Sequence, residues 1–114
     1  MQYHFEWDQV KNITNLRKHG ISFEEAAEIF LDPLHLSMPD TEHSELEERW
    51  ITMGNTQAHQ LHLVVHTYMT YHQEQVTIRI ISARPATRHE QNVSTLNPMV
   101  KAISNRYDLR ILSN

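Results

Sequence analysis

Apolar residues near the start of the chain recur at helical spacing and predict an amphipathic helix. Val10, Ile13 and Leu16 form one stripe at three-residue intervals, as expected for one face of a helix. Asp8 is a suitable N-cap for this helix, and Gly20 suits the left-handed position that ends it.

A second helix follows this glycine turn. Ser22 and Glu25 have the spacing of a capping box, which marks a helix start. Asp32-Pro33 stops the helix, because a residue before proline is disfavoured in helical conformation. Its buried face is expected to consist of Phe23, Ala26, Ala27 and Phe30.

Beyond Pro33 the apolar residues alternate with polar ones, and this period of two predicts strands. The connections are short and polar, which favours an antiparallel meander. The sequence therefore predicts an α+β fold, with two N-terminal helices packed on one face of a small antiparallel β-sheet. The expected strands cover residues 2–6, 34–38, 49–53, 61–68 and 76–81.

The C-terminal part is less patterned. Residues 87–91 resemble a helix start, and Pro98 suits the first position of a further helix. Residues 107–112 fit a short strand or disorder. We expect a domain over residues 1–92 and an extension over 93–114 that either joins this domain or is disordered.

Composition narrows the class of protein. The chain has 114 residues, a length that predicts one domain. It has no cysteine, which excludes disulfides and thiolate metal sites. Its net charge is −4. No apolar run reaches the length of a membrane span and no signal peptide is evident, so a cytoplasmic protein without membrane contact is expected. This negative net charge argues against broad electrostatic binding to nucleic acid, which usually requires a basic surface. Three arginines nevertheless cluster late in the chain, at Arg79, Arg84 and Arg88.

Two distant stretches, one from Phe5 to Gly20 and one from Arg79 to Glu90, place a histidine, lysines and arginines in one small fold. Such a set can handle a phosphodiester without a metal or cofactor. The same stretches, in this order, resemble the BrnT family of toxins from bacterial type II toxin–antitoxin systems. The resemblance covers roughly residues 3–90. It rests on Phe5-x-Trp7-Asp8-x-x-Lys11, Asn15, Lys18-His19-Gly20, Phe23-x-x-Ala26, Asp32-Pro33, Glu48-Arg49, Gly54 and Ser82-Ala83-Arg84-x-Ala86-x-Arg88-x-Glu90.

The resemblance implies a RelE-like fold and a ribonuclease that is neutralised by a cognate antitoxin. In this family the antitoxin, BrnA, carries a ribbon-helix-helix DNA-binding domain. Operator DNA would then be contacted only through the antitoxin, in a hetero-oligomer, which is consistent with the acidity of this chain.

Metal-independent RNA cleavage requires proton transfer and stabilisation of charge at phosphorus. His19 is the first candidate for acid or base, because a histidine pKa near 6.5 suits both roles. At a helix C-terminus the macrodipole should favour its protonated form. Arg49 and Arg84, at strand ends, are candidates for binding the phosphate, and Lys18 is a further one. His19 also has a structural interpretation as a helix-terminal cap, and Lys18 as an exposed lysine at a helix end.

Weaker candidates complete the predicted site. Glu48 could act as a base or lie in a solvated acidic loop. Arg79 and Arg88 could bind RNA or be surface charges. Arg79 and Arg84 would face opposite sides of a regular strand, so they share one site only if the strand bulges or the site wraps its end. Trp7 could stack on an unpaired base, although the core is the favoured position for it.

The remaining histidines carry a separate hypothesis of a metal site. His62 and His66 share one face of a strand but lie about 13 Å apart, too far for one ion. His59, His62, His66 and His72 are therefore interpreted as surface histidines. A histidine-dependent metal binder remains the weakest functional alternative. The main rival to the nuclease is a catalytically inactive toxin-like module that binds an antitoxin or regulatory partner.

Overall fold

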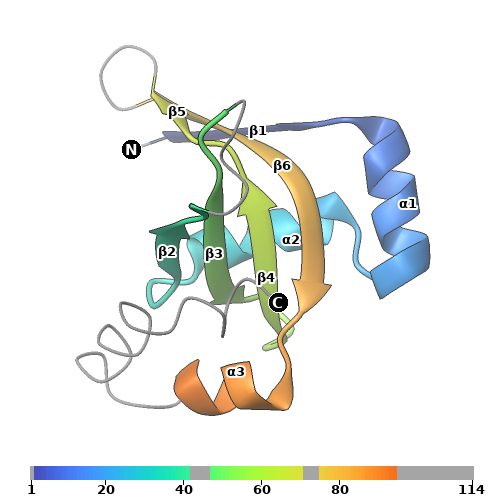
Figure 1. Cartoon of the computed structure of the whole chain (residues 1–114), viewed down its shortest axis with the longest axis vertical. Coiled ribbons are helices and arrows are strands. Elements are labelled where there is room, and N and C mark those ends of the chain that lie inside the picture. Colours follow the sequence, from blue (N-terminus) through green and yellow to red (C-terminus); the bar gives the residue numbers. More distant parts are fainter. Residues whose placement is uncertain (1, 42–46, 71–74, 95–114) are drawn as a thin grey trace.

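The chain forms one mixed β-sheet with helices on one face and at its margins (Figure 1). The computed structural model describes residues 2–41, 47–70 and 75–94. The strands are β1 (Gln2–Trp7), β2 (Leu36–Pro39), β3 (Trp50–Asn55), β4 (Leu61–His66), β5 (Met69–Thr70) and β6 (Gln75–Pro85). The helices are α1 (Gln9–His19), α2 (Phe23–Ala27), the 3-10 helix η1 (Glu28–Leu31) and α3 (Arg88–Ser94).

The sheet confirms the predicted meander but is not wholly antiparallel. Its strand order is β1-β6-β4-β3-β2, and β5 pairs with β6. The pairs β2–β3, β3–β4 and β4–β6 are antiparallel, whereas β1 runs parallel to β6. The antiparallel prediction is therefore wrong for the N-terminal strand. All the intervening elements from α1 to β5 separate β1 from β6 in the chain, so β6 can return beside β1 in the same direction. Strand alternation alone cannot reveal which neighbour a strand will take.

The boundaries of several elements also differ from the predictions, and three of them differ most. β4 ends at His66, and Met69–Thr70 forms a separate short strand instead of continuing it. β6 extends to Pro85, beyond the predicted end at residue 81. The second helix is short and tightens into the 3-10 turn of η1 before it stops at Asp32.

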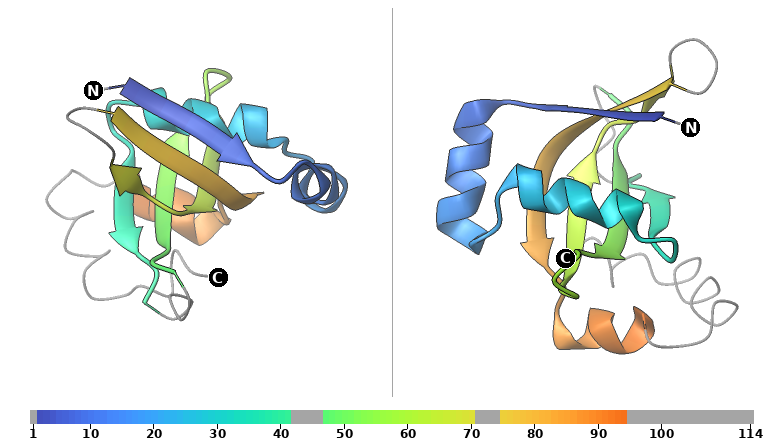
Figure 2. Two further views of the ribbon diagram at one scale, coloured as in Figure 1. Left: turned by 90° about the horizontal axis from the view of Figure 1, so that it is seen from above. Right: turned by 180° about the vertical axis from the view of Figure 1, so that it is seen from behind.

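The main core lies between the α2–η1 segment and one face of the sheet, which we call the helix face (Figure 2). Phe23 and Ile29 are fully buried against Val64 of β4 and Ile78 of β6. The aromatic residues of β1 pack against the same cluster. A smaller cluster on the opposite face contains Met38, Ile51, Met53 and Leu63.

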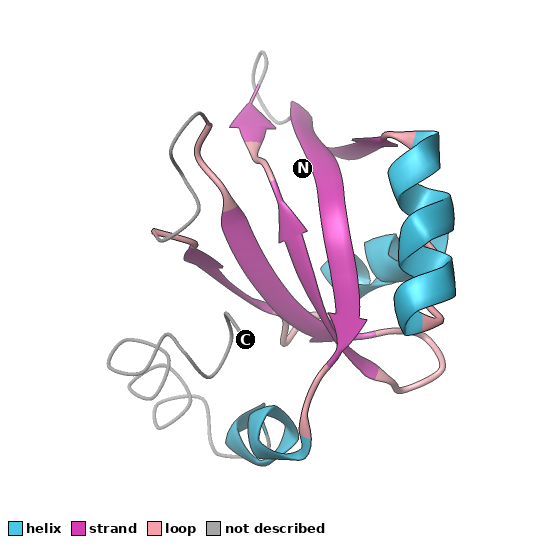
Figure 3. Ribbon diagram, turned by 45° about the vertical axis from the view of Figure 1, so that its right-hand side comes forward, coloured by secondary structure: helices cyan, strands magenta, loops and turns pink. Residues whose placement is uncertain are grey.

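Helix α1 is oriented differently from the prediction. It stands beside the sheet along β6 (Figure 3), and its apolar stripe is exposed: Val10 by 72%, Ile13 by 45% and Leu16 by 50%. The buried residues are instead Asn12 and Asn15. Their amides satisfy backbone groups that would otherwise be buried without partners, which the periodicity of apolar residues cannot show.

Asn15 and Asn12 fasten α1 to the rest of the fold. The Nδ2 of Asn15 donates to the carbonyl oxygens of Ile21 and Ala83, each at 2.9 Å, and its Oδ1 accepts from the amide of Ala83 at 3.0 Å. The Oδ1 of Asn12 accepts from the amide of Phe23 at 2.8 Å. These bonds fix the turn after α1 beside the end of β6, where His19 lies.

The predicted caps are confirmed. The Asp8 carboxylate accepts from the amides of Val10 and Lys11, and Gly20 has the left-handed φ of 73°. Ser22 caps α2 through the amide of Glu25. Within the described residues, every helix is too short or too polar to span a bilayer. The predictions for residues 98–112, for His72 and for most of the extension after residue 92 lie outside the described residues.

Candidate functional site

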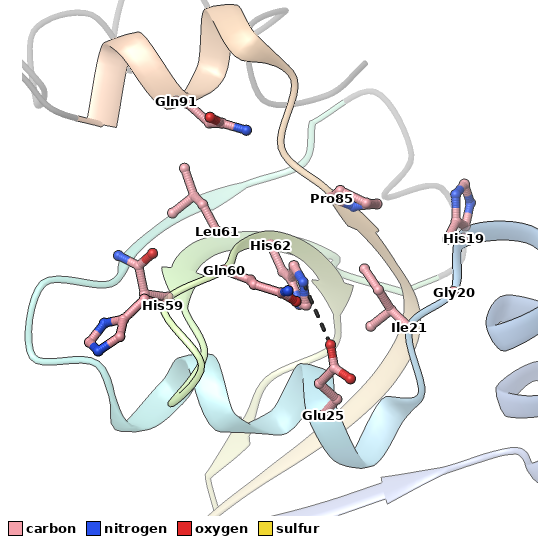
Figure 4. A pocket seen from close by; sticks show the side chains of 11 residues that line it. His19, Gly20, Ile21, Glu25, His59, Gln60, Leu61, His62, Pro85 and Gln91 are labelled. Atoms are coloured by element: carbon pink, nitrogen blue, oxygen red, sulfur yellow. Dashed lines mark ion pairs between the residues drawn. The ribbon is translucent and has the colours of Figure 1, made fainter.

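A pocket of about 670 Å³ opens where β6 ends and the turn between α1 and α2 passes it (Figure 4). Its size falls within the usual range for small-ligand sites. Three imidazoles and one carboxylate supply its titratable groups: His19, His59, His62 and Glu25. Loop, sheet and α3 residues complete the lining: Gly20, Ile21, Asn55, Gln60, Leu61, Pro85 and Gln91.

His19 is the last residue of α1 and is half-buried at one side of this pocket. Desolvation lowers its pKa below 6.5, and the positive charges of Lys18 and Arg84 lower the pKa further. The expectation that the helix macrodipole favours the protonated form is therefore wrong for this residue. Partial burial and the two cationic neighbours disfavour the charged imidazole, so the neutral form predominates at pH 7.

Glu25 of α2 and His62 of β4 form a pair inside the pocket. The Oε2 of Glu25 lies 3.7 Å from the Nε2 of His62 (Figure 4). The His62 side chain is 3% exposed, and burial lowers its pKa while Glu25 and Glu28 act in the opposite direction. Its buried Nδ1 has no hydrogen-bond partner in the described part of the chain. The half-exposed Glu25 is the more accessible member of the pair.

Arg84 is held at the end of β6 by a buried carboxylate. Its Nη1 and Nη2 donate to the two oxygens of Glu90, each at 2.9 Å. Glu90 is 1% exposed and also accepts from the amide of Thr87 at 2.8 Å. This bidentate pair anchors the start of α3 and fixes a guanidinium charge close enough to act on His19.

Arg49 and Arg79 lie at the opposite end of the sheet. Both approach Glu47: the Nε of Arg49 lies 4.0 Å from its Oε1, and Arg79 forms an ion pair with its Oε2. Arg79 and Arg84 are about 16 Å apart along β6. The structure thus brings Arg84 to His19 and separates Arg49, Arg79 and the exposed Glu48 from both.

A β-bulge determines which way these arginines face. Ile80 pairs with His66, but Ser82 pairs with Val65, so Ile81 is an extra residue in β6. Ile80 and Ala83 both belong to the main core. Arg79 and Arg84 consequently lie on the same face of the sheet, which a regular strand would not allow.

All lining residues of the pocket except Gln91 lie within the region that matches a known protein family. Residues 7–90 match the family model described as "Ribonuclease toxin, BrnT, of type II toxin-antitoxin system". The chain belongs to the BrnT family of ribonuclease toxins. Among solved structures it is similar in fold to the Brucella abortus ribonuclease toxin BrnT, with a TM-score of 0.56 and 24% sequence identity. That match covers 77% of this chain and 100% of the Brucella chain. No curated protein matched the sequence.

Three further residues of the family motif differ in how far they are exposed to solvent. Lys18 is exposed beside His19, and Arg88 is exposed at the first position of α3. Trp7 is half-buried and packs edge-on against Phe23, with ring centroids 6.2 Å apart. Trp7 therefore contributes to the core that supports the BrnT fold.

Sequence reasoning missed two residues of the pocket. Glu25 was assigned to a capping box, but its carboxylate approaches His62, and only Ser22 caps the helix through its side chain. His62 and His66 were interpreted as surface histidines, which is wrong: they are 2% and 0% exposed. The signal available was their position among Leu63, Val64 and Val65, because a strand so rich in apolar residues tends to be buried on both faces.

His59 agrees with its surface prediction. It is exposed in the β3–β4 turn and has a positive φ of 61°. Within residues 2–41, 47–70 and 75–94, no three histidine or carboxylate side chains gather closely enough to hold a metal ion.

Proposed function

We propose that this BrnT-family chain is an endoribonuclease that cleaves RNA without a metal ion, at the pocket beside His19. The position of His19 carries the proposal: a half-buried imidazole lines a cavity, and the charges of Lys18 and Arg84 act on it. Such a group is neutral at pH 7 and can accept a proton next to a bound phosphate. The family assignment supplies RNA as the substrate class.

In the proposed reaction His19 removes the proton of the ribose 2′-hydroxyl. The 2′-oxygen then bonds to phosphorus while the bond from phosphorus to the 5′-oxygen breaks, and that oxygen takes up a proton from water in the open pocket. The products are a 2′,3′-cyclic phosphate and a 5′-hydroxyl. Lys18 and the guanidinium of Arg84 stabilise the negative charge that develops on the phosphate oxygens.

Arg49 and Glu48 act elsewhere in this proposal. Because Arg49 lies at the Arg79 end of the sheet, it would meet a part of the RNA distant from the bond being cut. Arg49 and Arg79 would then influence binding of RNA more than the cleavage step. The exposed Arg88, at the start of α3, is a further candidate for binding RNA.

Removal of the His19 imidazole tests this site. Purified His19→Ala is expected to cleave a labelled RNA about 100-fold or more slowly than the wild type, the usual effect of losing a general base. His4→Ala is the matched control, because His4 is exposed on β1 and does not line the pocket. Equal rates for His19→Ala and the wild type would contradict the proposed site.

We also propose that a BrnA-like antitoxin with a ribbon-helix-helix domain neutralises this chain and contacts the operator DNA. The type II family assignment and the net charge of −4 support this division of roles. In a gel-shift assay the complex should retard operator DNA, and this chain alone should not. Retardation by this chain alone at physiological salt would contradict the assignment of DNA contact to the antitoxin.

A further inference from the structure

A second pocket, of about 270 Å³, lies on the helix face near the start of β3. Its volume is just below the range for drug-sized ligands, so it suits a single ring system better than a whole oligonucleotide. We call it the aromatic pocket, because five of its lining residues carry a ring: Tyr3, Phe30, His35, Trp50 and Tyr68. The remaining lining residue is Ser37.

The rings provide walls for a flat ligand. The rings of Trp50 and Tyr68 have centroids 6.0 Å apart and an interplanar angle of 46°. Phe30 and His35 also have centroids 6.0 Å apart. Tyr68 is 43% exposed and Trp50 is half-buried, so a ligand can reach the ring faces from solvent. Nucleobases stack on such side chains whatever their sequence, since every base has a π face.

A chain of hydrogen bonds behind this pocket determines whether the Ser37 hydroxyl, the one aliphatic hydroxyl of its lining, donates or accepts toward a ligand. The Nδ1 of His66 lies 3.0 Å from the carbonyl oxygen of Thr67, which can only accept, so Nδ1 carries the proton. His66 is fully buried, and desolvation lowers its pKa to about 4. The ring is therefore neutral, and its Nε2 accepts from the Thr52 hydroxyl at 2.6 Å.

The same series of hydrogen bonds extends from Thr52 to Ser37 in the pocket. Because Thr52 donates its only hydroxyl proton to His66, its Oγ1 can only accept from Ser37, at 2.6 Å. Ser37 therefore donates its hydroxyl proton to Thr52, and the lone pairs of the Ser37 Oγ remain to accept a hydrogen bond from a ligand. A ligand that stacks on the rings and offers an N–H group to Ser37 satisfies this pocket best.

We propose that the aromatic pocket binds one unpaired nucleobase of the RNA, and that Ser37 favours a base with an exocyclic amino group. Adenine and cytosine present such a donor, whereas uracil presents carbonyl oxygens around its single N–H. This inference rests on the proposed function for RNA as the ligand. His62 lines the pocket beside His19, and His66 pairs with Trp50 of the aromatic pocket. These two histidines are about 13 Å apart along β4. The bound base would therefore lie away from the cut bond and influence where the RNA is cleaved.

Binding of uncleavable RNA tests this directly. The probes are fluorescent 2′-O-methyl tetranucleotides of A, C or U, whose blocked 2′-oxygen prevents cleavage, and the readout is anisotropy. The wild type should bind the A and C probes roughly fivefold more tightly than the U probe. Tyr68→Ala should weaken binding of every probe roughly tenfold, whereas the matched control Tyr68→Phe should not.

Ser37→Ala should remove the preference for A and C, and Ser37→Thr, which keeps the hydroxyl, should retain it. Arg49 and Arg79 already approach the carboxylate of Glu47, so we expect their charges to add little to the affinity for RNA at this pocket. Stacking on the aromatic rings should therefore dominate this affinity. The loss caused by Tyr68→Ala should then be similar at 50 and 200 mM salt. Circular dichroism checks that each variant is folded.

The outcomes separate this inference from the nuclease proposal. Unchanged probe affinity in Tyr68→Ala overturns the inference even if the wild type cleaves RNA. Equal affinity for A, C and U overturns the role of Ser37. Weaker antitoxin binding by Tyr68→Ala with unchanged probe binding assigns the pocket to a protein partner and also overturns it. Probe binding that depends on Tyr68, in a chain that cleaves no RNA, supports the pocket and rejects the catalytic proposal alone.

Discussion

The surroundings of His19 bear on which proton-transfer step its imidazole can perform. Partial burial lowers the pKa of this histidine most, and the charges of Lys18 and Arg84 lower it further. A neutral imidazole at pH 7 is suited to accept the proton of a 2′-hydroxyl, and a protonated one is suited to donate. The environment of His19 therefore favours the role of base.

Lys18→Ala tests this electrostatic link. Removing the exposed ammonium group should raise the pKa of His19, because one of the charges that oppose its protonation is lost. NMR titration of the imidazole should show the increase. The acidic limb of the pH–kcat/KM profile should move to higher pH by the same amount.

The matched control is Lys11→Ala, which removes an exposed lysine from the same helix. It should leave the pKa of His19 unchanged. An unchanged pKa of His19 in Lys18→Ala would contradict the electrostatic link. An acidic limb that does not follow the measured pKa of His19 would contradict His19 as the base.

At the scale of elements, polar side chains determine how α1 is placed. A helix with an apolar stripe is expected to bury that stripe, but α1 exposes it and buries Asn12 and Asn15. The three hydrogen bonds of Asn15 tie the turn after α1 to Ala83 in β6. The helix end that carries His19 is positioned by these amide contacts.

Asn15→Ala should lower the free energy of unfolding by about 2–3 kcal/mol, because it leaves buried backbone groups of Ile21 and Ala83 without partners. Urea denaturation measures the change. Thr14→Ala, at the neighbouring exposed position of α1, should change stability by less than about 0.5 kcal/mol. Equal stability of the two variants would show that the amide contacts do not hold α1.

Gly54 allows η1 to approach β3 closely. A Cβ at this position would lie 3.0 Å from the backbone oxygen of Ile29 and 3.1 Å from the Cβ of His35. Gly54→Ala should therefore destabilise the protein by about 1–3 kcal/mol through overpacking.

Thermal denaturation of Gly54→Ala should show a lower Tm than that of Gln57→Ala, a change at an exposed turn position. A Tm for Gly54→Ala equal to that of the wild type would mean that η1 and β3 can separate without cost.

For the whole molecule, the sequence predicted the fold class and most elements, because caps and alternation are local signals. Asp8, Gly20 and Ser22 end or begin helices as expected. The parallel position of β1 depends on tertiary contacts, which local patterns do not encode. The burial of His62 was signalled only by the apolar run that surrounds it, and not by the histidine itself.

The candidate site was predictable only in part for the same reason. His19, Lys18 and Arg84 are adjacent in the fold, as the motif suggested, whereas Arg49 and Arg79 meet Glu47 at the far end. A bulge at Ile81 sets the faces of Arg79 and Arg84. One extra residue in a strand reverses every later side chain, and the apolar pattern gives no warning of it.

The most direct test of the central claim is the end-group analysis of RNA cut by the purified wild-type chain in excess EDTA. We predict internal cleavage that is insensitive to the chelator and leaves 2′,3′-cyclic phosphate and 5′-hydroxyl ends. Activity that disappears in EDTA and returns with a divalent cation, or products with 5′-phosphate ends, would contradict the metal-independent mechanism at His19.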